Sequence, residues 1–183
     1  MLNHKGTQPI QTERLLLRRF TIEDARAAFD NWQSDENVTR YLTWNAYTDI
    51  EKAQEYLQNQ VIDKYSQSNF YNWAILYDGE VVGNIDVTRM DEENFSAVIG
   101  YCIGKKWWSQ GIVTEALKAV INHLFSCGFI RIDARHDLIN PASGKVMEKA
   151  GMEFEGIIRK RVKNNEGKLV DVKQYSIINP IYS

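Results

Sequence analysis

Hydrophobic and polar residues along the chain follow two different periods, and the switch between them divides the sequence into strands and helices. Seven segments show the short apolar runs, or the alternation of apolar and polar residues, that are typical of β-strands. They cover residues 13–20, 70–77, 80–88, 95–104, 129–138, 153–163 and 168–178. Asp78 and Gly79 join the second and third segments, and this pair is a strong signal for a hairpin turn.

Four further segments carry apolar residues three or four positions apart, which is the period of an amphipathic helix. Two of them open with a threonine followed three residues later by an acid, at Thr21 and at Thr48, and this is the capping pattern of a helix start. We expect the second helix to reach about Tyr65. The other two cover residues 112–127 and 140–150. The predicted order is therefore β-α-α-β-β-β-α-β-α-β-β.

Length and composition favour one domain with its own core. The chain has 183 residues, of which 44% are apolar and 25% are charged. This is enough for one hydrophobic core and too little for two. Residues 1–12 show neither a strand nor a helix pattern, and we expect them to lie loosely on the surface. Residues 13–183 then form the folded domain.

Charge and cysteine content argue against several classes of function. The formal net charge of −2 gives no general attraction to nucleic acid or to an anionic membrane. The first residues do not resemble a signal peptide, and no window reaches the ~18 uninterrupted apolar residues of a membrane span. Cys102 and Cys127 lack the spacing of a metal site. We therefore expect two buried free thiols, no bound metal and a cytoplasmic protein.

Gly111 stands between the strand-like residues 95–104 and the helix expected from Ile112. The first backbone amides of a helix have no intrahelical partner, and together with the helix dipole they bind anions such as phosphate. A glycine here lets a ligand approach the backbone, although a glycine that merely ends a loop explains the same spacing. The segment lacks the GK[ST] ending of a P-loop and the three glycines of a dinucleotide-binding turn. ATP and NAD are therefore disfavoured.

Four stretches of the sequence carry a family pattern: QTERLLLRRF (11–20), IGYCIGKKWWSQGIVTEAL (99–117), NPASGKVMEKAGMEFEG (140–156) and DVKQYSI (171–177). Together they resemble the GNAT superfamily of N-acetyltransferases, and most closely the branch of the ribosomal-protein N-terminal alanine acetyltransferases. The resemblance covers nearly the whole chain. It implies a single-domain α/β fold with a central mixed, mostly antiparallel sheet of about six to seven strands. One strand pair would be splayed, and about four helices would flank the sheet.

The resemblance also implies a reaction, the transfer of an acetyl group from acetyl-CoA to a primary amine, and a set of cofactor-binding residues. These are Ile103, Gln110, Gly111, Ile112, Val113, Thr114, Glu115, Asn140 and Ser143. The amides of residues 110–115 would wrap the pyrophosphate, and the strand that ends at Ile103 would pair with the pantetheine arm. Trp108 and Val113 depart from the family pattern Gln/Arg-x-x-Gly-x-Gly/Ala at its first and last positions. Asn140, followed by proline, fits a plain helix cap equally well.

Acetyl transfer needs a base that takes a proton from the amine. His136 is one candidate, because it lies in the strand-like residues 129–138 just before the motif at Asn140 and imidazole titrates near neutral pH. A structural histidine explains the same position. Asp86 and Glu153 are acidic alternatives near the expected cleft, and the sequence leaves the choice open. His4 and His123 lie outside the motifs and are poorer candidates.

The departing thiolate needs a hydrogen-bond donor or an acid. Tyr101 is one candidate on the strand before the loop, and Ser143 is another by resemblance. By the same resemblance, four aromatic residues border the amine site, namely Trp44, Tyr47, Tyr71 and Trp73. Packing in the core explains these aromatic residues as well.

The acceptor stays open at this level, as a protein N-terminal amine or a small-molecule amine, and the resemblance allows a homodimer because the family often pairs. Two other functions compete with catalysis. One is a non-catalytic module that binds acyl-CoA, in which the phosphate site persists without a working base. The other is an α/β phosphate-binding domain with no preference for coenzyme A.

Overall fold

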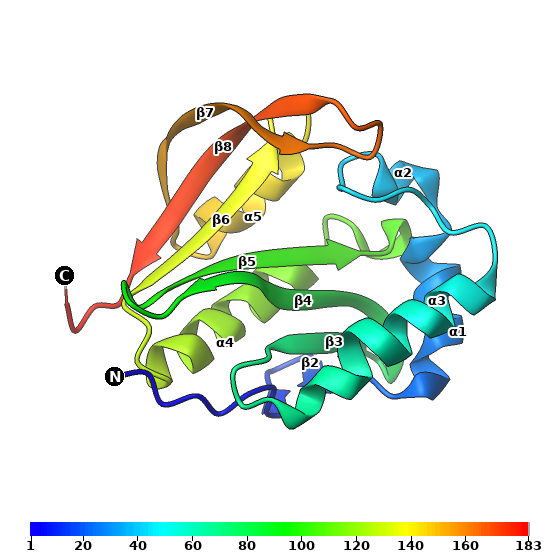
Figure 1. Ribbon diagram of the computed structural model, residues 1–183, viewed down its shortest axis with the longest axis horizontal. Coiled ribbons are helices and arrows are strands. Elements are labelled where there is room, and N and C mark those ends of the chain that lie inside the picture. The colour runs from blue at the N-terminus through cyan, green and yellow to red at the C-terminus, as the bar shows by residue number, and fades with distance from the viewer. Residues whose placement is uncertain (183) are drawn as a thin grey trace.

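The computed structural model describes residues 1–182 and shows one eight-stranded sheet (Figure 1). The strands are β1 (Ile10–Gln11), β2 (Leu15–Arg18), β3 (Asn72–Tyr77), β4 (Glu80–Asp91), β5 (Ser96–Ile103), β6 (Arg131–Asp137), β7 (Glu153–Lys163) and β8 (Leu169–Ile178). They lie in the order β1-β2-β3-β4-β5-β6-β8-β7. Among these described strands every neighbouring pair is antiparallel except β5 and β6, which run parallel.

Helices cover both faces of the sheet. On one face lie α4 (Ile112–Ser126) and α5 (Pro141–Lys149); on the other lie α1 (Ala25–Ala28), η2 (Phe29–Gln33), α2 (Glu36–Thr39), α3 (Ile50–Tyr56), η3 (Leu57–Val61) and η4 (Ile62–Ser66). Two short 3-10 turns, η1 (Ile22–Asp24) and η5 (Lys105–Trp107), lead into α1 and follow β5. Strand β3 shows the two faces clearly, because Trp73 and Ile75 pack in the cluster with α4 while Ala74 packs with α1 and η3.

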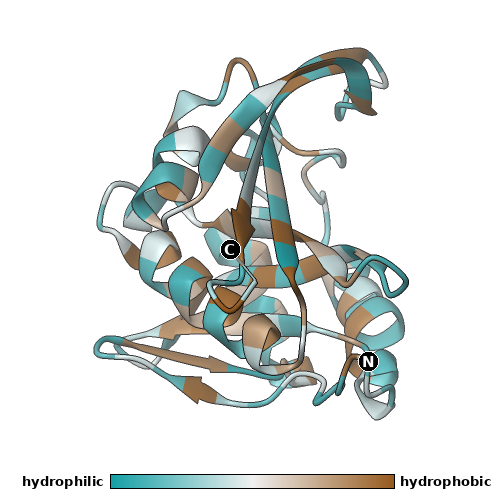
Figure 2. Ribbon diagram, turned by 90° about the vertical axis from the view of Figure 1, so that its left-hand side faces the viewer, coloured by the Kyte–Doolittle hydropathy of each residue, from teal (hydrophilic) through white to brown (hydrophobic). Residues whose placement is uncertain are grey.

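The periodicity of the sequence has its physical origin in this layered core. Figure 2 shows hydrophobic and hydrophilic residues alternating along the long strands, as expected where successive side chains point to opposite faces. On α4, the predicted apolar stripe from Val113 to Leu124 is buried in the main cluster. The GNAT-like α/β fold is therefore confirmed, with eight strands in place of about seven because the two residues of β1 pair with β2.

The capping pattern predicted at two helix starts is present at one of them and displaced by one residue at the other. At Thr21 the predicted capping pattern is present, since the amide of Thr21 donates to Asp24 Oδ2 at 2.8 Å. At Thr48 the prediction is off by one residue, because Asp49 is the cap and its Oδ1 accepts from the amide of Lys52 at 3.1 Å. A carboxylate in the cap position accepts a backbone amide as readily as a hydroxyl does, and here it is one residue closer to the helix.

The expectation of a loose N-terminal segment is wrong. The amide of Asn3 donates to Cys127 O at 2.8 Å, and Trp73 Nε1 donates to Gln8 O at 2.7 Å. Thr7 is 1% exposed, and its hydroxyl accepts from the amide of Asn72 at 2.9 Å. The segment is held largely by polar and backbone bonds to distant residues, and such bonds leave no periodic signal in the sequence.

The feature that positions the functional site is the divergence of β5 and β6. Their parallel pairing is confined to residues Ser96 to Val98 of β5 and Arg131 to Asp133 of β6. Both strands continue beyond that point, to Ile103 and to Asp137, and Figure 1 shows them separating. The splayed pair implied by the family resemblance is present, and it leaves one edge of β5 without a neighbouring strand.

Replacing Thr7 by valine tests the role of the N-terminal segment. Thr7→Val removes the acceptor of the Asn72 amide and leaves a buried N–H without a partner, so we expect the free energy of unfolding to fall by about 1–3 kcal/mol. Urea denaturation measures this change. The matched control is Thr48→Val, at an exposed position, where we expect a change within about 0.5 kcal/mol. Equal effects of the two substitutions would show that the segment contributes nothing to stability.

Candidate active site

A cavity of about 510 Å³ opens where β5 and β6 diverge. Strands β3, β4 and β5 line one side of it, and β6, α5 and the β7–β8 hairpin line another. The segment between Trp32 and Val61, which includes α3, lines the third side. The cavity therefore joins three parts of the chain that are far apart in the sequence.

The floor of the cavity includes a row of residues in register across three strands. Asn72 on β3 is paired with Asp86 on β4, and Asp86 is paired with Gly100 on β5. A Cβ atom added to Gly100 would lie 3.5 Å from Asp86 Oδ1. The same Cβ atom would lie only 2.7 Å from Thr88 Cγ2, so the absence of a side chain at Gly100 lets Thr88 and Asp86 pack closely against β5 at the cavity floor.

Asp86 has the electrostatic properties of a base that works near neutral pH. Burial raises its pKa to about 7, since the charged carboxylate loses solvation there. Its polar contact within the sheet is with Asn84 Nδ2, at 3.4 Å. A carboxyl group that titrates near pH 7 and faces a cavity can both accept and release a proton under ordinary conditions.

His136 is placed less favourably for proton transfer. As predicted, it shares a buried face of β6 with Ile132 and Ala134. Its Nδ1 lies 2.7 Å from Asp137 O, and its Nε2 is buried without a partner. A Cβ atom at Gly144 of α5 would lie only 2.6 Å from that Nε2. Burial lowers the pKa of His136, so the ring is neutral at pH 7 and its free nitrogen faces the backbone of a helix.

Tyr101 and Ser143 meet across the divergence of the strands. Tyr101 Oη donates to Ser143 O at 3.0 Å and lies 2.8 Å from Ser143 Oγ. Burial strongly raises the pKa of Tyr101, so the phenol keeps its proton and acts as a donor. Asn140 is the cap of α5, with Oδ1 accepting from the Ser143 amide at 3.4 Å. The candidate donors Tyr101 and Ser143 therefore form one unit beside the cavity.

Glu153 does not lie where the sequence analysis expected it. It is exposed at the start of β7, where it pairs with Ser176 near the end of β8, and it is absent from the cavity lining. The cavity is lined by the other end of the hairpin, at Val170 and Val172. Sequence proximity to α5 suggested the cleft, but the direction of β7 carries Glu153 away from it.

The loop before α4 has the backbone geometry of an anion site. Gly111 has a φ of +77°, in the left-handed region that favours glycine, and it is the residue at which α4 begins. The first bond within the helix is from the Glu115 amide to Gly111 O at 3.0 Å, so the amides of residues 112–114 precede it. Val113 is 7% exposed, so its side chain is buried and not open to solvent. The family departure at Val113 therefore adds no bulk on the open side of the loop.

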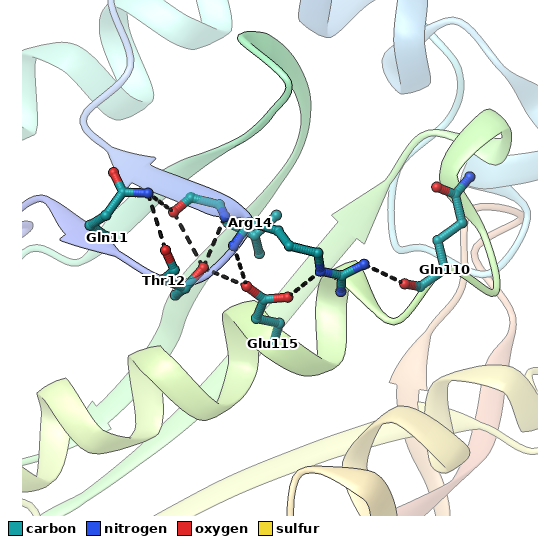
Figure 3. Close-up of polar contacts among 6 residues, drawn as sticks. Gln11, Thr12, Arg14, Gln110 and Glu115 are labelled. Atoms are coloured by element: carbon teal, nitrogen blue, oxygen red, sulfur yellow. Dashed lines mark hydrogen bonds and ion pairs between the residues drawn. The ribbon is translucent and has the colours of Figure 1, made fainter.

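A polar cluster that the sequence analysis missed fixes this loop to β2 (Figure 3). Arg14 Nε donates to Glu115 Oε2 at 2.7 Å, and Arg14 Nη1 donates to Gln110 O at 3.1 Å. Thr12 Oγ1 donates to Glu115 Oε1 at 2.6 Å. The Glu115 side chain is thus engaged by Thr12 and Arg14 and its amide by Gly111 O, so Glu115 holds the loop in place. The bonds span about a hundred residues of sequence, and no local pattern marks them.

The aromatic candidates divide into two groups. Trp44 and Tyr47 line the cavity with their ring centroids 5.5 Å apart. Tyr71 and Trp73 are stacked in the main core and do not line it. Tyr56, which the sequence analysis did not single out, lies in the lining, and burial raises its pKa to about 12.

The two cysteines differ in environment. Cys127 is buried in the main core, whereas Cys102 is partly exposed and lines the cavity, so the expectation of full burial was wrong for Cys102. Burial still raises the pKa of the Cys102 thiol to about 12. The thiol is therefore protonated at pH 7 and is a poor nucleophile.

Among residues 1–182, no helix combines the length and the hydropathy needed to cross a membrane.

Comparison with known proteins agrees with this geometry. Residues 14–153 match the acetyltransferase (GNAT) domain family. The protein named uncharacterized N-acetyltransferase p20, from Bacillus licheniformis, is 32% identical over 180 residues, which are 96% of this chain and 99% of that protein. The structure of a GNAT-family acetyltransferase from Bacillus anthracis has a TM-score of 0.81 at 27% identity, covering 93% of this chain and 98% of that one.

A ribosomal alpha-N-protein acetyltransferase, RimL, solved in complex with coenzyme A, has a TM-score of 0.83 at 22% identity, covering 93% of this chain and 98% of that one. Ribosomal-protein acetyltransferases also occur among the relatives found by sequence. The family match extends over most of the chain and includes β5, the Gly111 loop and α5. The chain therefore belongs to the GNAT acetyltransferase family and is an N-acetyltransferase, with ribosomal-protein N-acetyltransferases among its relatives.

Proposed function

We propose that this protein transfers an acetyl group from acetyl-CoA to a primary amine that enters the cavity, with Asp86 as the general base. The observation that carries the proposal is the position of Asp86. Asp86 lines the cavity opposite Gly100 of β5, and burial brings its pKa to about 7. His136 shares the cavity but has its free nitrogen against α5, and Glu153 lies outside the cavity.

The donor fits the two features on either side of β5. The pyrophosphate of coenzyme A would bind the amides of residues 110–114, where Gly111 opens the loop and the start of α4 favours an anion. The pantetheine arm would pair with the free edge of β5 from Ile99 to Ile103, and Asn140 lies at the far side of the same opening. The complex of the RimL structure with coenzyme A supports this choice of donor.

The reaction then requires one proton transfer on each side of the thioester. Asp86 takes a proton from the ammonium form of the acceptor, and the freed nitrogen lone pair attacks the thioester carbonyl carbon. The carbon–sulfur bond breaks, and the thiolate leaves with the bonding electron pair. Tyr101 keeps its proton because burial raises its pKa, and its single O–H would turn from Ser143 O to donate to the thiolate, which then takes up a proton from water. The products are an amide and free coenzyme A thiol.

The acceptor would be either a protein N-terminal amine or a small-molecule amine. Names among the relatives, such as ribosomal-protein-serine acetyltransferase, support the first choice. The volume of about 510 Å³, shared with the thioester end of the donor, has room for one or a few residues of a chain terminus or for a small amine. Two free thiols fit a reducing compartment such as the cytoplasm.

Thiol release tests the reaction itself. Incubation with acetyl-CoA and a panel of polyamines, amino acids, aminoglycosides and peptides with free N-termini should release coenzyme A thiol only when a suitable amine is present. Mass spectrometry should show a gain of one acetyl group on that amine. Tight binding of acetyl-CoA without thiol release over the whole panel would instead favour a non-catalytic acyl-CoA-binding module.

Removing the charge at Asp86 tests the base. Asp86→Asn should lower kcat by about 10²- to 10⁴-fold. In the wild type, kcat/KM for the amine should rise with pH through about 7, as Asp86 loses its proton. Steady-state kinetics between pH 5.5 and 8.5 measure both. Glu153→Gln is the matched control, and an equal loss of rate in the two variants would contradict the assignment.

The same substitution should have the opposite effect on stability. The folded-state pKa of Asp86, about 7, lies above the unfolded value of about 3.9, so the folded state binds the proton more tightly. Stability contributed by this group is therefore present at low pH and is lost as the pH rises toward 7. Asp86→Asn should have a Tm equal to or above that of the wild type at pH 8. A clear fall in Tm at pH 8 would mean that the carboxylate is a structural group.

A charge at Gly111 tests the donor loop. Gly111→Asp should abolish measurable binding of coenzyme A, because a carboxylate would lie at the phosphate site. Gly111→Asn is the matched control, since asparagine has nearly the same shape, tolerates a positive φ and carries no charge. Calorimetric titration with coenzyme A should show a much smaller loss for the asparagine variant. Similar affinities of the aspartate and asparagine variants would refute the assigned loop.

A further inference from the structure

Two residues that line the cavity have a buried side-chain amide oxygen without a hydrogen-bond partner. Asn72 on β3 and Gln33 at the end of η2 are each 5% exposed, and both line the cavity. Asn72 Oδ1 and Gln33 Oε1 are buried oxygens without a donor. An unpaired buried polar group costs about 1–3 kcal/mol of stability. Such groups are rare in native proteins, and two of them in one cavity indicate that something else supplies the missing donors.

The fold holds Asn72 in place beside Asp86. Its backbone amide donates to Thr7 Oγ1 at 2.9 Å, and its carbonyl accepts from Tyr65 Oη at 2.8 Å. The register of β3 and β4 puts Asn72 directly opposite Asp86, so the two side chains leave the sheet on the same face. The backbone is thus fixed by two hydrogen bonds to side chains of other segments, while the side-chain oxygen has no partner.

Gln33 reaches the same cavity from the helical side. Its backbone carbonyl accepts from the amide of Tyr47 at 2.8 Å, and this bond ties the end of η2 to the loop that carries Trp44 and Tyr47. The Gln33 side chain is therefore positioned by a bond that does not use its own amide group.

The chemistry of these groups indicates what they bind. Two amide oxygens and the Asp86 carboxylate are hydrogen-bond acceptors, and a primary ammonium group offers three N–H donors. An alcohol or a thiol offers one donor and would leave acceptors unpaired. Buried acceptors without partners discriminate strongly against a molecule that lacks the matching donors.

We propose that Asn72 Oδ1 and Gln33 Oε1 hold the acceptor as a primary ammonium group beside Asp86, and that they select primary amines over alcohols and thiols. This inference rests on the proposed function and names two residues that determine its specificity. Asn72 and Gln33 position the ammonium nitrogen, and Asp86 then removes its proton. The unpaired oxygens lower the stability of the free protein, and binding of an amine restores this stability by supplying the missing donors.

The variants Asn72→Leu and Gln33→Leu test the assignment. Leucine has a similar volume and no polar atom, so neither variant should have a lower Tm than the wild type. Loss of an amide with a structural role would instead lower the Tm. For the best amine of the panel, KM should rise about 10- to 100-fold, the range expected for a lost hydrogen bond to a charged group. KM for acetyl-CoA should stay within about twofold of the wild type. Asn69→Leu, at an exposed position outside the cavity lining, is the matched control and should change neither constant.

A binding measurement separates this inference from the proposed reaction. Titration with n-butylammonium, followed by two-dimensional NMR, should show saturable shifts in the wild type and much weaker ones in both leucine variants. The isosteric n-butanol should produce no saturable shifts. No binding of n-butylammonium to the wild type, or equal binding to wild type and variants, would overturn the inference. Failure of the proposed reaction would appear separately, as absence of thiol release by the wild type.

Discussion

The parting of β5 from β6 is the constraint on which the rest of the site depends. A continuous sheet would fill this space with strand pairing, whereas here the pairing ends after Val98 and Asp133. The gap exposes the edge of β5 to a ligand and brings α5 and Asp86 to the borders of one cavity, and the Gly111 loop follows the end of β5. Tyr101 and Ser143 connect the two sides across the gap, so the opening keeps a defined width. The divergence thus provides both the donor groove and the acceptor cavity.

The cavity retains groups that the fold alone would not favour. Asp86 is a carboxyl group whose burial raises its pKa to about 7, and Asn72 and Gln33 keep unpaired oxygens. Apolar residues of the same size would make the folded state more stable at each of these positions. One explanation accounts for all three groups, namely that each gains its partner from the same acceptor amine. Substitutions at these positions that raise the stability of the folded state should therefore lower the activity, as is usual for functional sites.

Local patterns predicted most of the fold but only part of the site. The periodicity of the sequence predicted the strands and helices, because each element buries one face in the core around the sheet. Gly111 and Asn140 were found because the residues at the start of a helix follow strong local preferences. Asn72, Gln33 and Arg14 were missed. Their roles depend on strand register, on burial and on bonds between distant segments, such as the pair of Arg14 and Glu115. Glu153 failed for the same reason, since its distance from the cavity depends on the direction of β7.

Asp86 is the group proposed to accept the proton from the amine, and the ionisation of its carboxyl group can be observed directly. Carbon-13 labelling of aspartate side chains and NMR titration of the carboxyl resonances, with Asp86→Asn to assign the signal, would give its pKa in the free protein. We expect a value near 7, the same as the pH at which kcat/KM for the amine reaches half of its maximum. A pKa near the ordinary value of about 3.9, with the rate still rising near pH 7, would contradict it.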